Sequence, residues 1–351
     1  RQLAPDFLIC EVGGTVGDIE GLPFIEAIRQ YRYDIGFKNT CFIHVTLVPY
    51  LKTSGEVKTK PSQHSVNALR NVGIQPDILV CRTELPLGET ERLKLAQFTN
   101  VSPESVIQCL DQSCLYEVPL ALEQEGLARE VLQRLGVPNT LPQLSAWQQM
   151  VQSMKFPVHQ TTIAVVGKYT GLSDAYLSVI EALKHAAAAV NTAVNIRWID
   201  AEDCTQPEAT AALLQGAHGI VVPGGFGYRG IEGKIEVIRH ARENRLPFLG
   251  LCLGMQCAVI EFARNVAQLT RANSVEFDPD TDQPVVGLMD EQKTVADKGG
   301  TMRLGQYPCH LVPGTQAMAA YQADVIQERH RHRYEVNNEY RHILTQAGLV
   351  I

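Results

Sequence analysis

The chain has 351 residues, of which 45% are hydrophobic and 20% charged, a composition typical of globular proteins and a length sufficient for two domains. Its formal net charge of -7 gives no electrostatic reason to expect binding along a phosphate backbone, so nucleic acid is not a predicted partner. Its nine cysteines form no C-x-x-C pair, which favours a reducing cytoplasm, and no apolar run approaches the roughly 18 residues of a membrane span.

The first part of the chain alternates short apolar runs with helical patterns. Phe7–Cys10 is predicted as a strand, followed by a glycine-rich turn and a helix over Pro23–Tyr31. Cys41–Val48 and Asp77–Cys81 are further β-rich runs, each followed by a helical pattern, as a parallel sheet with helical crossovers requires. Residues 1–140 are therefore expected to form an α/β domain.

A polar segment containing several prolines, residues 141–160, is the expected interdomain linker, with a helix-like stretch at Leu144–Met154. Residues 161–351 are expected to form a second α/β domain. It is predicted to contain a helix over Ala175–Val190 and strands at Thr162–Gly167, Val194–Ile199, Gly219–Val222 and Phe248–Leu251. The fold class is thus α/β, with two doubly wound, mainly parallel sheets. The chain starts without methionine and ends in the strand-like run Gly348–Ile351, so both ends are expected to be incomplete.

Cys252 lies at the junction between a predicted strand and a predicted helix, Gln256–Val266, with a glycine two residues away on either side. At such a turn the thiol is exposed, and the helix N-terminus is expected to lower its pKa. Taken alone, G-x-C-x-G also fits a buried cysteine in a tight turn. Upstream, residues 223–227 (PGGFG) follow another strand, and their backbone N–H groups could stabilise an oxyanion.

The P-G-G loop followed by G-x-C-x-G-x-Q at this interval resembles the class I glutamine amidotransferases, whose fold is flavodoxin-like. The resemblance implies that Cys252 attacks the side-chain amide of glutamine and releases ammonia. It also implies that the N–H groups of Gly225 and Leu253 stabilise the oxyanion, and that Gly225, Gln256 and Glu276 hold the substrate.

Residues 328–337 (ERHRHRYEVN) are by composition typical of a solvated charged strand or loop, but their order resembles the CTP synthase family. That resemblance implies contacts from Arg333 and Tyr334 to the α-carboxylate of glutamine. GFGYRG at 225–230 and GGTMRLG at 299–305 also resemble this family, the first as a lid associated with GTP activation. The family's catalytic His and Glu lie in an F-H-P-E motif that is absent here, and neither His330 nor His332 is assigned as the base.

Residues 11–20 (EVGGTVGDIE) follow the first predicted strand, where α/β proteins bind ligands, although a turn with solvated acids has the same composition. Followed by PFIEAIRQ at 23–30, this string resembles the amidoligase signature of CTP synthases. The resemblance implies that Glu11 binds Mg²⁺ at the phosphates of ATP and UTP. It places Asp18, Ile19 and Glu20 around the pyrimidine nucleotide.

The segment KTKPSQ at 58–63 combines two lysines, hydroxyl groups and an amide before a helix, which suits a triphosphate, although a solvated basic loop is the alternative. The resemblance implies a UTP and CTP site formed by Lys58, Thr59, Lys60, Pro61, Ser62, Gln63 and Lys94. No G-x-x-x-x-G-K-[ST] loop occurs in the chain; in the family, a P-loop-type amidoligase, it lies upstream of the segment that matches residue 1.

The resemblance covers both parts of the chain and implies a glutamine-hydrolysing CTP synthase: ATP phosphorylates the uracil 4-oxygen of UTP, and ammonia then displaces the phosphate. It further implies Mg²⁺, GTP as allosteric activator, CTP as feedback inhibitor and a homotetramer, with the chain by itself inactive or partially active. Another amidotransferase–synthetase fusion would share the Cys252 motif but lack the segments around Glu11 and Lys58. A catalytically dead relative that binds nucleotides or forms filaments is the third reading.

Overall fold

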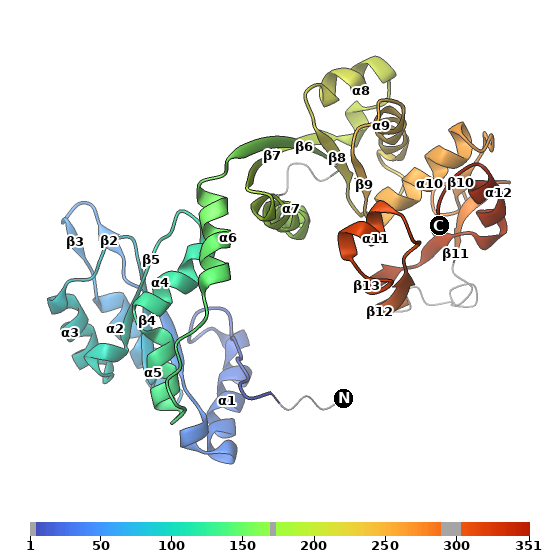
Figure 1. The fold of residues 1–351 in the computed structure, drawn as a ribbon. Helices are drawn as coiled ribbons and strands as arrows, with labels where there is room; N and C mark the ends of the chain where they lie inside the picture. The colour runs from blue at the N-terminus through green and yellow to red at the C-terminus, as the bar shows by residue number, and fades with distance from the viewer. Residues whose placement is uncertain (1–4, 169–172, 289–302) are drawn as a thin grey trace. The chain divides into compact units, whose positions relative to one another are not determined.

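The computed structural model describes residues 5–168, 173–288 and 303–351 (Figure 1). The chain divides into two compact units, Arg1–Lys155 and Phe156–Ile351. The last helix of the first unit, α6 (Ser145–Lys155), is attached to that unit because Trp147 Nε1 donates to Tyr116 O at 2.7 Å. The boundary between the two units, after Lys155, falls inside the predicted linker, residues 141–160. The bounds of that linker stay a prediction.

The first unit contains a parallel sheet with the strand order β1-β4-β5. Its strands are β1 (Ile43–Leu47), β4 (Ile78–Thr83) and β5 (Val106–Leu110). Helices connect and cover them: α1 (Leu22–Ile35), α2 (Lys60–Asn71), α3 (Glu89–Thr99), α4 (Val118–Gln124) and α5 (Leu127–Arg134). A short hairpin of β2 (Tyr50–Leu51) and β3 (Glu56–Val57) precedes α2.

Strand β4 shows why this sheet is covered on both faces. Leu79 belongs to an apolar cluster with Val66 of α2 and Leu95 of α3, whereas Val80 belongs to a different cluster with Leu127 of α5. Because successive side chains of a strand point to opposite faces, both faces of β4 are buried. The predicted doubly wound α/β fold is confirmed for this unit.

One of the two edge strands of this sheet is β1, where burial alternates along the strand. His44 and Thr46 lie under α2, while Ile43, Val45 and Leu47 are 43%, 66% and 56% exposed. The outer face of this edge strand therefore presents three apolar side chains.

The prediction of strands at Phe7–Cys10 and Gly348–Ile351 is wrong, because neither segment is a strand in the structure. Ile9 is 92% exposed, and no described strand is hydrogen-bonded to either segment. A β-strand requires a neighbouring strand to satisfy its backbone groups, and an apolar run does not by itself provide one.

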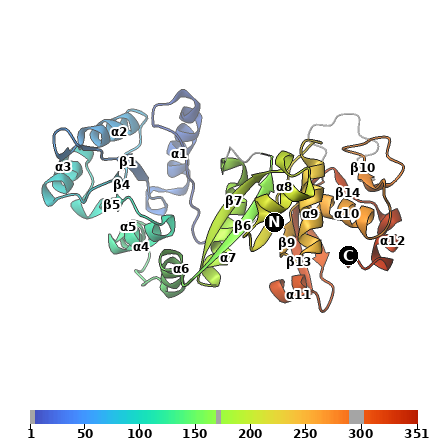
Figure 2. The same ribbon diagram turned by 90° about the horizontal axis from the view of Figure 1, so that it is seen from above.

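The second unit contains a four-stranded parallel sheet in the order β7-β6-β8-β9 (Figure 1). Figure 2 shows its paired strands β6 and β7 from a second direction. Its strands are β6 (His159–Gly167), β7 (Thr192–Asp200), β8 (Gly219–Val222) and β9 (Phe248–Gly250), which confirms the predicted strands. Its helices are α7 (Leu177–Ala189), α8 (Pro207–Leu214), α9 (Ile231–Glu243) and α10 (Leu253–Asn265). Helix α7 begins at Leu177, two residues after the predicted start at Ala175, because a 3₁₀ turn occupies Ser173–Tyr176.

A smaller sheet, β10-β11-β14, and a separate antiparallel hairpin, β12-β13, follow α10. They consist of β10 (Asn273–Ser274), β11 (Pro284–Leu288), β14 (Tyr334–Val336), β12 (Arg303–His310) and β13 (Val325–His332). Two short helices, α11 (Gln316–Tyr321) and α12 (Arg341–Gln346), complete the unit. One apolar cluster joins the main sheet, α9, α10 and β11.

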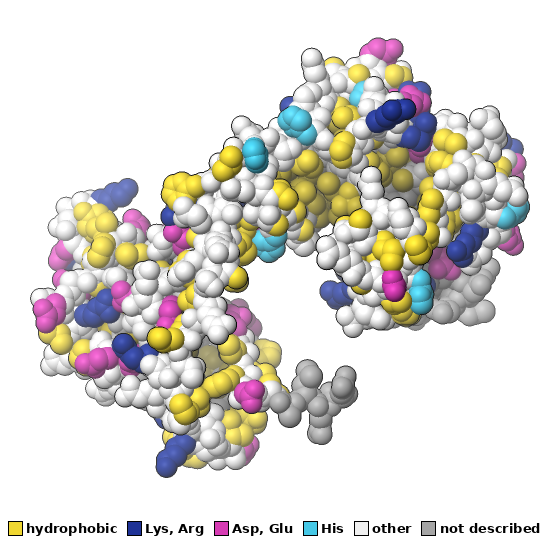
Figure 3. Space-filling view, in the orientation of Figure 1, with side chains coloured by type: hydrophobic (Ala, Val, Ile, Leu, Met, Phe, Trp, Pro, Cys, Tyr) yellow, Lys and Arg dark blue, Asp and Glu magenta, His cyan; other side chains and the backbone are white. Residues whose placement is uncertain are grey.

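On the face shown in Figure 3, acidic and basic side chains are interspersed over both units. No helix within the described residues is long and apolar enough to cross a membrane.

Candidate active site

Cys252 lies between β9 and α10, at the position that caps the helix, with backbone angles of φ 54° and ψ -108°. A positive φ is uncommon for a residue with a side chain, and such backbone strain is often found at functional sites. The sharp strand-to-helix turn predicted from the sequence is therefore present.

The two glycines that flank Cys252 are required by close packing. A Cβ on Gly250 would lie 2.6 Å from the carbonyl carbon of Gly254, and a Cβ on Gly254 would lie 1.9 Å from Val222 O of β8. The turn can therefore form only if both positions lack a side chain.

The backbone N–H groups of Leu253 and Gly225, the pair expected to form the oxyanion hole, face the Cys252 thiol and favour its thiolate form. Burial is the largest influence and raises the pKa of this thiol; the two N–H groups oppose the effect, and the charge of Glu276 adds to it. The expectation of a lowered pKa is therefore wrong, because desolvation outweighs the donors at the helix N-terminus.

A cavity of about 320 Å³ opens beside Cys252. It is lined by all the residues expected to contact glutamine (Gly225, Gln256, Glu276, Arg333 and Tyr334), together with Phe226, Arg331 and His332. These residues come from β13, β14, α10 and the loops after β8 and β10. The structure thus brings together residues that lie up to about a hundred positions apart in the sequence.

Two expected contacts are fixed by backbone partners. Gln256 is buried, and its Nε2 donates to Tyr334 O at 3.0 Å, which joins α10 to β14. Glu276 Oε1 accepts a hydrogen bond from Gly227 N at 2.9 Å. The cavity therefore presents a carboxylate and guanidinium groups from separate elements, a combination that matches the two charges of an amino acid.

Sequence reasoning missed Arg331 and His332 as lining residues. His332 contacts His330, with 3.2 Å between their Nδ1 atoms, and no hydrogen bond joins either imidazole to Cys252 within the described part of the chain. Strand alternation would have placed Arg331 with Arg333, but β13 ends at His332, so His332 reaches the cavity as well. In the GGTMRLG motif, residues 299–302 lie outside the described residues.

In the first unit, the expected nucleotide residues form two groups. Lys58 pairs with Glu56, whose pKa is lowered by Lys58 and, more weakly, by Lys94 of α3. Lys60, at the start of α2, lies 5.7 Å from the ring centre of Phe98. Lys58 and Lys60 therefore lie at the N-terminus of α2, where an anion would also meet backbone N–H groups, and the charge of Lys94 acts on the neighbouring Glu56.

The polar residues of the same segment face inward. Ser62 Oγ donates to Leu47 O at 3.1 Å, and Gln63 Nε2 donates to Thr59 Oγ1 at 3.2 Å. Thr59, Ser62 and Gln63 are all buried, so their side chains orient the helix start, and Pro61 occupies its first turn.

The loop before α1 forms the other group. Its expected ligands Glu11, Asp18, Ile19 and Glu20 are exposed, and Asp18 Oδ2 accepts from Thr15 N at 3.1 Å. Within the described ranges, no hydrogen bond or ion pair joins this loop to the lysine group, and no cluster of three His, Cys, Asp or Glu side chains could hold a metal ion. A lone exposed carboxylate nevertheless fits Mg²⁺, which is often held by one or two carboxylates plus substrate phosphates.

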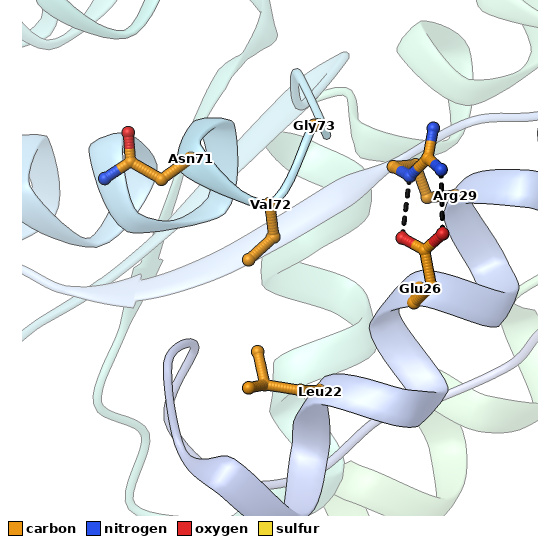
Figure 4. Close-up of a pocket in the computed structure, with 6 residues that line it drawn as sticks. All are labelled: Leu22, Glu26, Arg29, Asn71, Val72 and Gly73. Atoms are coloured by element: carbon orange, nitrogen blue, oxygen red, sulfur yellow. Dashed lines mark hydrogen bonds and ion pairs between the residues drawn. The ribbon is translucent and has the colours of Figure 1, made fainter.

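A second cavity, of about 410 Å³, lies between α1 and the end of α2 (Figure 4). Glu26 and Arg29 form a two-bond ion pair at its side, at 2.8 and 2.7 Å. None of the expected nucleotide ligands lines it.

Comparison with known proteins identifies the family. The family model described as CTP synthase N-terminus matches residues 1–137, and that described as glutamine amidotransferase class-I matches residues 171–350. The chain belongs to the CTP synthase family. CTP synthases of Caldanaerobacter subterraneus and Carboxydothermus hydrogenoformans are both 58% identical to it, over 99% and 100% of the chain, and that of Synechocystis is 56% identical over 99%. The chain spans 63% to 65% of the length of these CTP synthases.

A solved structure supports the same family. The glutaminase domain of the Trypanosoma brucei CTP synthase, with bound acivicin, is 42% identical with a TM-score of 0.50. The match covers 54% of this chain and 74% of that one.

Proposed function

We propose that the second unit hydrolyses glutamine at Cys252 and supplies ammonia for the amination of UTP to CTP. The observation that carries this proposal is the convergence of Gly225 N–H and Leu253 N–H on the Cys252 thiol, beside a cavity that offers Glu276 and Arg333. A cavity of about 320 Å³ is large enough for an amino acid, and its charges match the ammonium and carboxylate of glutamine.

In the proposed reaction, the Cys252 thiolate attacks the amide carbon of glutamine, and the carbonyl electrons move to an oxygen held by the two N–H groups. The C–N bond then breaks and ammonia leaves with the added proton. Water hydrolyses the resulting thioester to glutamate and restores the thiol. Because burial raises the pKa of Cys252, this attack requires a base, and we assign that role to neither His330 nor His332.

The first unit is proposed to bind UTP, with ATP as phosphoryl donor. Lys58, Lys60 and Lys94 would neutralise phosphate charge, Glu11 would bind Mg²⁺, and the loop with Asp18, Ile19 and Glu20 would contact the pyrimidine nucleotide. Bound Mg²⁺ would supply charge neutralisation at the phosphates. By family membership we further propose GTP activation, CTP feedback inhibition, a homotetramer and a cytoplasmic location.

The glutamine half is tested with diazo-oxo-norleucine, an electrophilic glutamine analogue. We expect one adduct by intact mass, located on Cys252 by peptide mapping and absent from Cys252→Ala. No adduct, or equal labelling of the other eight cysteines, would contradict a formed glutamine site.

The nucleotide half is tested by isothermal titration with UTP and Mg²⁺. We expect Lys58→Ala to weaken binding by about tenfold or more, since one charged phosphate contact is worth about 1.5–3 kcal/mol. Lys184→Ala, on the exposed face of α7, is the matched control and should bind as wild type. Equal affinity of wild type and Lys58→Ala would remove the lysine group from the proposed site.

A further inference from the structure

Two buried lysines lie against the loop that carries Gly225. Lys168 directly follows β6 and is 8% exposed, and Lys234 of α9 is 1% exposed. A Cβ on Gly225 would lie 3.7 Å from Lys168 Cε and 4.0 Å from Lys234 Nζ. The proposed hydrolysis uses neither amine, and buried lysines without a function are rare because their desolvation is costly.

Lys168 contacts this loop through a defined hydrogen bond. Its Nζ donates to Phe226 O, and the next backbone group, Gly227 N, donates to Glu276 Oε1 at 2.9 Å. Phe226 O and Gly227 N–H belong to the same peptide group and point in opposite directions. One peptide is therefore held between a cation on its oxygen and a carboxylate on its N–H, which matches its dipole and makes both bonds charge-assisted.

The backbone on both sides of this peptide depends on such contacts. Arg229 Nη2 donates to Lys168 O at 2.9 Å, so the lysine is itself bound to the loop. Gly224 and Gly225 have no side chain to fix their conformation, and Gly227 has a φ of 76°, which glycine adopts without a steric penalty. In the absence of these bonds, the loop has few interactions that specify one conformation.

We propose that Lys168 is a positioning residue: its bond to Phe226 O fixes the peptide between residues 226 and 227, so that Gly225 N–H stays directed at Cys252. Glu276 acts on the same peptide from the other side, which couples the amino-acid cavity to the oxyanion hole. Lys234 supports the loop from within the core. Both side chains meet the same position of the loop, because a Cβ on Gly225 would lie within 4.0 Å of each. Burial lowers the pKa of Lys234, and the positive charge of Lys168 also acts to lower it.

This inference rests on the proposed glutamine hydrolysis, and two reagents test it. The α-chloroketone analogue of glutamine alkylates a thiol while its ketone oxygen occupies the oxyanion position. Methyl methanethiosulfonate modifies thiols and has no carbonyl group. The labelling rate of Cys252 with each reagent is measured by mass spectrometry for wild type, Lys168→Met, Lys168→Arg and the surface control Lys184→Met.

For Lys168→Met we expect the chloroketone rate to fall by about 10- to 100-fold, since removing a whole oxyanion donor costs about 10²–10³. The rate with methyl methanethiosulfonate should change by less than about twofold, because the thiol itself is intact. Lys168→Arg should recover part of the chloroketone rate, and Lys184→Met should match wild type. If circular dichroism shows that Lys168→Met does not fold, Lys168→Gln replaces it with the same expected ratio, because its side chain is polar but uncharged and too short to reach Phe226 O from this position.

The inference is overturned if Lys168→Met labels with the chloroketone at the wild-type rate, or if both reagents slow by the same factor, which a purely structural role would produce. A wild-type chain that the chloroketone does not label at Cys252 overturns the proposed hydrolysis and this inference with it. A labelled wild type with an unchanged variant overturns this inference alone.

Discussion

Gly254→Ala is expected to separate α10 from β8. The new Cβ would lie 1.9 Å from Val222 O, whereas heavy atoms in contact need about 3.5 Å, so the two elements must move apart by more than about 1 Å. Alanine improves helix propensity by about 1 kcal/mol, but overpacking costs about 1–3 kcal/mol and more where the backbone must shift. Since the atom met is a backbone oxygen in the buried core, we expect a net loss of about 3 kcal/mol.

The assay is urea unfolding followed by the fluorescence of Trp198, which lies on β7, in a Trp147→Phe background that removes the other tryptophan. With a urea m-value of about 2 kcal/mol/M, the midpoint should fall by about 1.5 M. The folded fraction should also label about 100-fold more slowly with the chloroketone, because a displacement of about 1 Å costs about 10² in rate. Gly287→Ala of β11, where a Cβ would meet nothing within 4 Å, is the control. A midpoint equal to that of wild type would refute the steric argument.

Two further substitutions test the electrostatics of each unit. Asp77→Asn should lower the free energy of unfolding of the first unit by about 3 kcal/mol in urea titrations, because Asp77 is 14% exposed and accepts bonds from two arginines and a backbone N–H. The control is Asp111→Asn, which removes the exposed ion pair with Arg82 and should cost less than about 1 kcal/mol. A similar loss in both variants would contradict this. Burial, followed by neighbouring positive charge, lowers the pKa of His330 and His332, so the second unit should keep its full stability above about pH 6.5 and lose it as pH falls through the lowered values. Changing both histidines to glutamine should flatten that loss between about pH 7 and about pH 5 in urea titrations, and an unchanged pH dependence would exclude them as its source.

The parallel strands of the second unit could be predicted because strands buried on both faces appear as short continuous apolar runs, such as Gly219–Val222. The same reasoning failed at Phe7–Cys10, since a strand also requires a hydrogen-bonding neighbour, which an apolar run does not encode. The turn at Cys252 could be predicted from its flanking glycines, because the steric conflicts at these positions are local.

Other features of the site depend on contacts between distant residues. The pKa of Cys252 reflects how deeply the folded chain buries it, and burial is not visible in a local motif. Lys168 lies 58 residues from the carbonyl that it binds, and nothing in its own segment indicates a partner in the P-G-G loop. Glu276 likewise could not be predicted from periodicity. It was predicted from the family resemblance, which carries information about contacts between distant residues.

The backbone of Cys252 has a consequence for the history of the site. At φ 54° and ψ -108°, any residue with a Cβ is strained by about 1–3 kcal/mol, and glycine alone would relieve that strain. Replacing Cys252 by glycine would therefore be expected to raise the free energy of unfolding. Selection for stability alone would favour glycine at this position. A strained cysteine at this position is therefore better explained by a chemical role than by a contribution to stability.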